Sequence, residues 1–146
     1  MALKRTSTAV WQGGIPNGKG SITTLSGAFK DQPYSVKTRF QSEDGRAGTN
    51  PEELIAAAHA GCFTMALSAM LTNAGITPTE LRTTATVSIE KEGAGWAITG
   101  IQLDLIGKVP GVTAEQFQTH ADNAKKGCPV SRALSATPIA MTAKLA

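Results

Sequence analysis

The sequence predicts an α+β fold in which mainly antiparallel sheets surround one long helix. The first third of the chain consists of short strand-like runs separated by Gly and Pro turns. A long run of helix formers follows from Pro51 to Ala74, and two alternating runs at 81–90 and 96–106 then form a hairpin. Strands that arrive in hairpins, with helices between them, are typical of the α+β class. Because no repeat or linker interrupts the chain, we expect residues 1–146 to form a single domain.

Three strands are expected before the long helix, at 9–12, 20–26 and Tyr34–Phe40. The third alternates regularly, so that Arg39 would project from the face opposite Phe40. The turns at Gly27 and Pro33 favour an antiparallel meander of these strands.

The helix over Pro51–Ala74 carries signals at both ends. Asn50 is suited to cap it, Pro51 fits its first position, two acids occupy its first turn, and Gly75 supplies a stop. Its middle is almost entirely Ala and Gly, and it is apolar nearly all round, which indicates a buried central helix. The rest of one chain is too small to cover such a helix, so we expect a homodimer.

The remaining elements follow in order. The hairpin of 81–90 and 96–106 should contain a bulge near Gly100, where the alternation changes phase. Thr113 begins a helix with Gln116 three positions on, a capping-box pattern, and that helix should end at Gly127. A short helix then starts at Pro129, and a last strand covers 138–145.

Composition excludes several classes of function. The 14 basic and 11 acidic residues of the 146 give a net charge of +3 without any basic cluster, so nucleic acid is not an expected partner. No uninterrupted apolar run approaches the roughly 20 residues of a membrane span, and the N-terminus has no signal-peptide core. We therefore expect a cytoplasmic protein that does not use a membrane, in which cysteines are reduced or redox-active.

The two cysteines are the strongest candidates for chemistry. Cys62 lies midway along the long helix, and Cys128 lies at the start of a short one, near Lys125, Lys126 and Arg132. Free amide groups and nearby cations favour a thiolate at Cys128. The alternative is that both are inert core residues, which is common for cysteine. Their separation excludes a C-x-x-C site.

Histidines and cofactor motifs give weaker signals. His59, three positions before Cys62, is interpreted as a polar core or interface residue, with a base role toward Cys62 as the alternative. His120 is interpreted as a solvated helix residue. Neither histidine has the spacing of a zinc site, and no phosphate loop or dinucleotide fingerprint is present, so we expect neither a metal nor a cofactor.

A thiol that attacks a peroxide must be ionised, which requires a nearby positive charge. Arg39 is a candidate for that charge, and a solvated strand arginine is the alternative. Glu52, in the first turn of the long helix, is suited to hold the guanidinium by a bidentate pair. Its alternative role is compensation of the helix dipole, as for Glu53.

Three segments carry a family resemblance: Gly48–Leu54 (GTNPEEL), Ala57–Phe63 (AAHAGCF) and Lys126–Ser131 (KGCPVS). Together with Pro33-Tyr34 and Thr38–Phe40, they resemble the osmotically inducible protein C (OsmC) family, which is related to the organic hydroperoxide resistance (Ohr) proteins. The resemblance covers essentially the whole chain and favours the OsmC branch.

The resemblance implies an intertwined homodimer, in which antiparallel sheets wrap around paired central helices and active sites lie at the subunit interface. It also implies a metal-free cysteine peroxidase for organic hydroperoxides, and more weakly for hydrogen peroxide, regenerated by an external thiol. By position, Cys62 is the peroxidatic cysteine and Cys128 the resolving one. Arg39 activates the thiolate, with Arg46 as a second candidate, and Glu52 holds the arginine.

The residues around Cys62 and the function of the chain each allow more than one interpretation. Phe63, Met65 and Met70 are candidates for the apolar walls of a pocket beside Cys62, although core packing explains them equally well. The main alternative function is a non-catalytic, dimeric stress protein that binds a hydrophobic ligand. A purely structural stress protein is a second alternative, and no feature of the sequence supports it.

Overall fold

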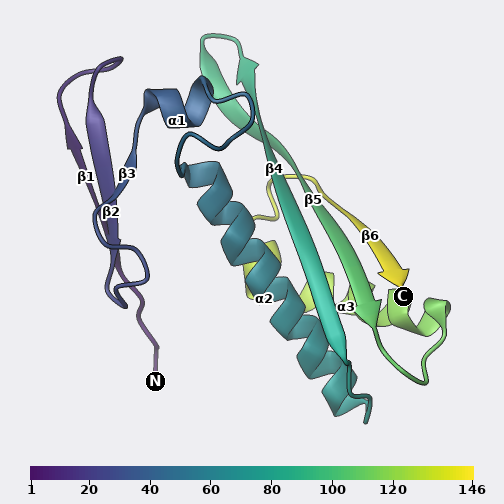
Figure 1. Cartoon of the computed structure of the whole chain (residues 1–146). Coiled ribbons are helices and arrows are strands. Elements are labelled where there is room, and N and C mark those ends of the chain that lie inside the picture. Colours follow the sequence, from purple (N-terminus) through teal and green to yellow (C-terminus); the bar gives the residue numbers. More distant parts are fainter. The chain divides into compact units, whose positions relative to one another are not determined.

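The computed structural model describes all 146 residues and divides them into two compact units, Met1–Pro51 and Glu52–Ala146 (Figure 1). The first unit is a three-stranded antiparallel sheet followed by a short helix. Its elements are β1 (Ser7–Gln12), β2 (Lys19–Thr24), β3 (Gln32–Tyr34) and α1 (Val36–Phe40). The strand order β1-β2-β3 confirms the predicted meander.

The predicted strand over Tyr34–Phe40 is wrong, because most of this segment is the helix α1. Ser35 caps the helix: its hydroxyl accepts from the backbone N–H of Thr38 at 3.2 Å, and the Thr38 hydroxyl accepts from the backbone N–H of Ser35 at 2.9 Å. This capping box satisfies N–H groups at the start of the helix. Alternation of apolar and polar residues over so short a run is compatible with a strand or a helix, and the capping box favours the helix. Arg39 therefore projects from a helix rather than from a strand.

The second unit packs helices against one face of a three-stranded sheet (Figure 1). Its elements are α2 (Pro51–Asn73), β4 (Glu80–Glu92), β5 (Gly95–Lys108), α3 (Ala114–Gly127), α4 (Pro129–Ala133) and β6 (Ile139–Leu145). β4 and β5 form the predicted antiparallel hairpin. Ser88 pairs with Gly100 and Ile89 with Ile98, so one extra residue of β5 forms the predicted bulge.

The expectation of antiparallel sheets is wrong for the last strand, since β6 pairs with β5 in parallel. The register runs from Ile101 opposite Ile139 to Gly107 opposite Leu145. The helices α3 and α4 lie between the two strands in sequence and carry the chain back to the starting end of β5. A crossover of this kind makes neighbouring strands parallel.

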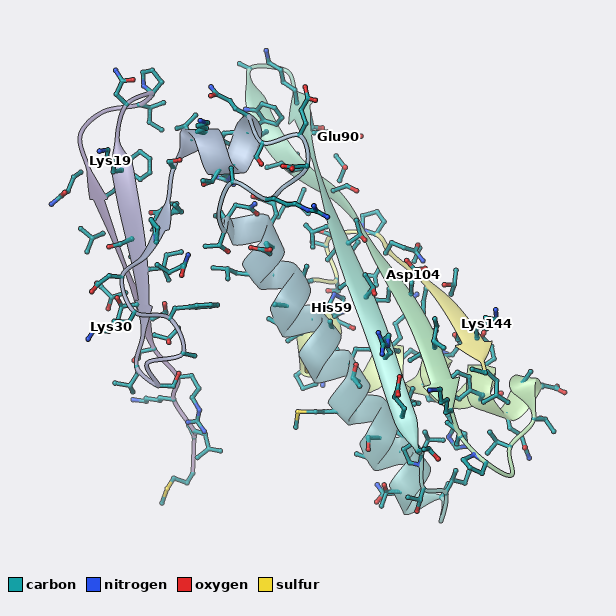
Figure 2. All side chains as sticks on the ribbon, viewed as in Figure 1. Lys19, Lys30, His59, Glu90, Asp104 and Lys144 are labelled. Atoms are coloured by element: carbon teal, nitrogen blue, oxygen red, sulfur yellow. The ribbon has the colours of Figure 1, made fainter.

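The hydrophobic core lies between the sheet and the helices α2 and α3. It contains alternate residues of β5 and one stripe from each helix, namely Ile101, Leu103, Leu105, Val109, Phe63, Leu67, Leu71, Phe117, Ala121, Ala124 and Cys128. The opposite face of the sheet is polar and exposed, as Glu90, Asp104 and Lys144 show (Figure 2).

The second unit buries α2 on one side only, and the cover expected on its other side depends on the predicted homodimer. The three strands offer a single face, so the other side of the helix is left exposed. That side carries small residues and Met65, whose exposed fraction is 75%. By length and composition α2 could also cross a membrane, with a mean hydropathy of 1.7, as core helices of soluble proteins could. The expectation that no apolar run reaches this length is wrong for α2, because its mean hydropathy stays high although His59, Thr64 and Ser68 interrupt the apolar residues.

The ends of α2 form as predicted. Pro51 occupies its first position, where the missing N–H is not needed. At the other end, Gly75 has a φ of +75°, the backbone N–H of Ile76 donates to the carbonyl of Leu71, and that of Gly75 donates to the carbonyl of Thr72. This is a Schellman motif, which satisfies the last carbonyls of the helix.

Candidate active site

The two cysteines meet in the second unit. Cys62 lies in the middle of α2 and Cys128 between α3 and α4, yet their Sγ atoms are only 3.2 Å apart. Both are free thiols, and Cys62 is half-buried whereas Cys128 is fully buried. Because a disulfide needs an S–S distance of about 2.05 Å, a small movement would join them.

Local sequence explains how Cys128 reaches this position. Its backbone N–H ends α3 by donating to the carbonyl of Ala124 at 2.8 Å, and Pro129 starts α4. A residue before proline is disfavoured in the helical region, and Cys128 is indeed extended, with φ −61° and ψ 121°. Gly127 lets this corner approach α2, because a Cβ there would lie 3.0 Å from the Cε of Met70.

The two thiols differ in pKa. Burial raises the pKa of the Cys62 thiol, and the hydrogen bond and charge of Cys128 raise it further, against one lowering bond from the backbone of Val130. Burial also acts to raise the pKa of Cys128, but hydrogen bonds from Ser131 and Cys62 outweigh it and lower the pKa. Within Glu52–Ala146 the thiolate is therefore favoured at Cys128, the direction expected from the sequence. Within the same unit the thiolate is disfavoured at Cys62.

Three cations stand near Cys128 in sequence, as noted above. Lys125, Lys126 and Arg132 line a pocket of about 350 Å³ together with Ser131. They contribute charge around this corner, while hydrogen bonds to the sulfur lower the pKa of Cys128 directly.

Arg39 belongs to the first unit and lines a pocket of about 370 Å³. The other walls are mostly aromatic or aliphatic, namely Trp11, Ile15, Tyr34, Ser35, Val36 and Phe40. The guanidinium carbon of Arg39 lies 4.8 Å from the centre of the Phe40 ring, a cation–π distance. Gly20 makes room for this arrangement, since a Cβ there would collide with Tyr34. Sequence reasoning missed this pocket because a strand would point Arg39 away from Phe40, whereas on α1 both residues line it.

The two acids at the start of α2 have different environments. Glu53 is exposed, as a carboxylate that only balances the helix dipole would be. Glu52 is buried, with an exposed fraction of 6%. A buried carboxylate needs a partner, so dipole compensation alone does not account for Glu52. Arg46 is exposed in the loop before α2, where its backbone N–H donates to Asp44.

His59 is the buried polar residue that the sequence predicted, and its hydrogen-bond partner is one that the sequence did not indicate. Its side chain is fully buried, and its Nε2 lies 2.7 Å from the Oγ of Ser131 rather than contacting Cys62. The two residues are 72 positions apart, so no local pattern reveals the pair. His120 is half-buried on α3. No three His, Cys, Asp or Glu side chains gather in a way that would hold a metal ion.

The three residues proposed as pocket walls beside Cys62 lie in different environments. Phe63 is a fully buried core residue, Met65 is exposed, and Met70 packs against the core near Gly127. Core packing therefore explains Phe63, and Met70 lies beside Gly127, next to Cys128 in sequence.

Comparison with known proteins places the chain in a family. The model of the OsmC-like protein family matches residues 42–144. Peroxiredoxin OsmC of Escherichia coli (strain K12) is 52% identical over 136 residues, which cover 93% of each chain. The organic hydroperoxide resistance protein of Xanthomonas axonopodis pv. citri (strain 306) is 37% identical over 107 residues, 70% of this chain and 73% of the relative.

The fold agrees with these matches. The crystal structure of the organic hydroperoxide resistance protein OhrB of Bacillus subtilis superposes with a TM-score of 0.68 at 26% sequence identity, covering 97% of this chain and 98% of the other. The chain is thus a member of the OsmC-like protein family.

Proposed function

We propose that this chain is a cysteine peroxidase that reduces organic hydroperoxides to alcohols, and hydrogen peroxide more weakly. The observation that carries this proposal is the 3.2 Å approach of a half-buried thiol to a fully buried one, from elements far apart in sequence. The relatives named peroxiredoxin and organic hydroperoxide resistance protein support the same chemistry.

The accessible sulfur begins the reaction. The Cys62 thiolate attacks one oxygen of the peroxide, the O–O bond breaks, and the released alkoxide takes up a proton to leave as an alcohol. Cys62 becomes a sulfenic acid. The Cys128 thiolate then attacks that sulfur, the S–O bond breaks, and the hydroxide takes up a proton and leaves as water. An external thiol reduces the resulting disulfide by exchange.

Arg39 supplies the positive charge that Cys62 needs. The environment of Cys62 in its own unit raises the pKa of its thiol. A nearby cation would lower that pKa and so favour the thiolate. Arg39 sits in a pocket with aromatic walls, which suits a molecule that has an apolar body and a polar peroxide group. Glu52, buried at the start of α2, holds the guanidinium in place, and Arg46 is the second candidate for the cation.

The working protein is an intertwined homodimer with its active sites at the subunit interface. The exposed apolar side of α2 supports this, because a second copy would remove it from water. Each chain acts as a single OsmC-like domain in the cytoplasm, without a metal, a cofactor, nucleic acid or a membrane. The non-catalytic ligand-binding alternative is not favoured, since it gives no reason for two thiols in contact.

Turnover measurements test the proposal. With cumene hydroperoxide and a dithiol reductant, the wild-type chain should consume peroxide continuously, and it should consume hydrogen peroxide more slowly. Cys62→Ser should show no turnover above the uncatalysed rate. Wild-type turnover in Cys62→Ser, or no loss of free thiols in the wild type after peroxide, would contradict the peroxidase.

A further inference from the structure

A chain of hydrogen bonds leads from a buried histidine to the buried thiol. His59, on α2 (Figure 2), places its Nε2 2.7 Å from the Oγ of Ser131. The Ser131 backbone N–H donates to the Sγ of Cys128 at 3.5 Å, and the Ser131 side chain lowers the pKa of the same thiol. All three residues are nearly or fully buried, with exposed fractions of 0% for His59 and Cys128 and 5% for Ser131.

Which atom donates in the His59–Ser131 hydrogen bond depends on which ring nitrogen of His59 carries the hydrogen. The Nδ1 of His59 has no partner in the chain. If Nδ1 carried the hydrogen, a buried donor would lack an acceptor, and the Ser131 hydroxyl would have to donate to Nε2 instead of to sulfur. If Nε2 carries it, His59 donates to Ser131, and the Ser131 hydrogen is free to point at Cys128. Buried donors without partners are the rarer case, so the second arrangement is favoured.

We propose that His59 is a positioning residue that acts through Ser131: it directs the Ser131 hydroxyl hydrogen onto the sulfur of Cys128 and so promotes the closure of the disulfide. This inference rests on the proposed peroxidase function and concerns its second step. In that step the Cys128 thiolate bonds to the sulfenic sulfur of Cys62, hydroxide leaves, and a proton converts it to water. The Cys128 sulfur is oxidised and the Cys62 sulfur is reduced.

His59 acts as a neutral group in this scheme. Burial lowers its pKa, which keeps the ring uncharged at neutral pH. The titratable group in contact with Cys128 is Cys62 on α2. The charged groups around the corner are Lys125 and Lys126 on α3 and Arg132 on α4, which line a pocket with Ser131. These cations would remain in every variant considered below.

Loss of the donor should have a measurable and limited effect. Removal of one hydrogen bond to a charged sulfur should raise the titration midpoint of Cys128 by about one pH unit. At a pH below the midpoint, the thiolate fraction would then be about tenfold lower. A more basic thiolate is also more nucleophilic, with a Brønsted coefficient of about 0.4–0.5. Disulfide closure should therefore slow about threefold at neutral pH.

The titration of Cys128 tests the proposal without any peroxide. In a Cys62→Ser background, the ultraviolet absorbance of the thiolate is followed against pH. Ser131→Ala removes the hydroxyl but keeps the backbone N–H, and His59→Leu removes the donor to Ser131. Both should raise the midpoint by about one unit. Ser135→Ala, which removes an exposed hydroxyl on the same segment, is the matched control and should not shift it.

A second arm separates hydrogen bonding from packing. His59→Gln keeps an amide N–H that can donate to Ser131, so its midpoint should stay near that of the control. In chains with both cysteines, His59→Leu should slow closure about threefold but leave the rate of Cys62 sulfenic acid formation unchanged. If His59→Leu fails to fold, His59→Ala, which also removes the donor to Ser131, takes its place in both arms.

Two results would overturn the proposal. One is a midpoint in Ser131→Ala or in His59→Leu equal to that of Ser135→Ala, and the other is an upward shift in His59→Gln as large as in His59→Leu. A wild-type chain that forms no sulfenic acid would instead overturn the proposed peroxidase, while the titration would still report on His59.

Discussion

The Sγ of Cys62 and the Sγ of Cys128 are 3.2 Å apart, although the first lies on a helix with an exposed side and the second is sealed in the core. In the proposed reaction, peroxide should approach the accessible sulfur more readily, and the buried sulfur lies within reach of the sulfenic acid that would form. This difference in exposure supports the proposed order, in which Cys62 reacts first and Cys128 second.

Replacement of the buried thiol should separate the two steps. After one equivalent of cumene hydroperoxide, Cys128→Ser should hold a single sulfenic acid at Cys62, because no second sulfur is in reach to condense with it. Dimedone labelling and intact-protein mass spectrometry detect this adduct. The wild type, treated identically, should contain an intramolecular disulfide instead. A labelled residue other than Cys62 would reverse the assignment.

The pH dependence of Cys62 should change in the same variant. The hydrogen bond and charge of Cys128 raise the pKa of Cys62 after the larger effect of burial. Removal of Cys128 therefore lowers the pKa of Cys62, and more thiolate is present at any pH below the midpoint. Iodoacetamide should alkylate Cys62 faster in Cys128→Ser than in the wild type at neutral pH. A midpoint that stays in place or rises would show that burial alone sets this pKa.

Arg39 should matter through its charge and its shape. Arg39→Ala should slow the reaction of Cys62 with cumene hydroperoxide by tenfold or more at neutral pH, since an opposite charge within reach typically shifts a pKa by about one unit or more. Arg39→Lys keeps the charge but loses the planar fork, so it should recover only part of the rate. Stopped-flow oxidation over a pH range measures both effects.

Arg46→Ala discriminates between the two candidate cations, because Arg39 and Arg46 are both exposed arginines of the same unit. It should leave the rate within twofold of the wild type. A larger loss in Arg46→Ala than in Arg39→Ala would transfer the activating role to Arg46.

Much of the second unit could be predicted from sequence because its signals are local. Pro51 and Gly75 bound α2, and Thr113 with Gln116 caps α3 through bonds of 2.9 and 3.2 Å. The alternation of β4 and β5 is long enough to exclude a helix. In Tyr34–Phe40 the alternation was too short to distinguish a strand from a helix. The signal that decides for a helix is the cap, in which the Ser35 hydroxyl accepts from the backbone N–H of Thr38, three residues on.

The site itself was predicted only in part, since its contacts are non-local. The pairing of Cys62 with Cys128 followed from a family resemblance rather than from spacing. The parallel pairing of β6 depends on where two helices return the chain, which no residue pattern within the strand encodes. His59 and Ser131 meet across 72 positions, and each on its own resembles an ordinary core residue.

The exposed side of α2 gives a direct test of the proposed homodimer. Met65 is 75% exposed in the single chain, so Met65→Glu should be nearly neutral for the folding of one chain. If a second copy covers this side, the new carboxylate is buried at the interface, at a cost of several kcal/mol. About 3 kcal/mol corresponds to a weakening of the dimer by more than 100-fold. Sedimentation and light scattering at micromolar concentration should therefore show a monomer.

The control for this experiment is Ile106→Glu, which places the same charge on the exposed face of the sheet, where Ile106 is 44% exposed. This variant should sediment like the wild type. Because the active sites are proposed to lie at the interface, peroxide turnover should fall in Met65→Glu and persist in Ile106→Glu. A monomeric wild type would rule out the homodimer, and a monomeric Met65→Glu with full turnover would show that one chain carries a complete site.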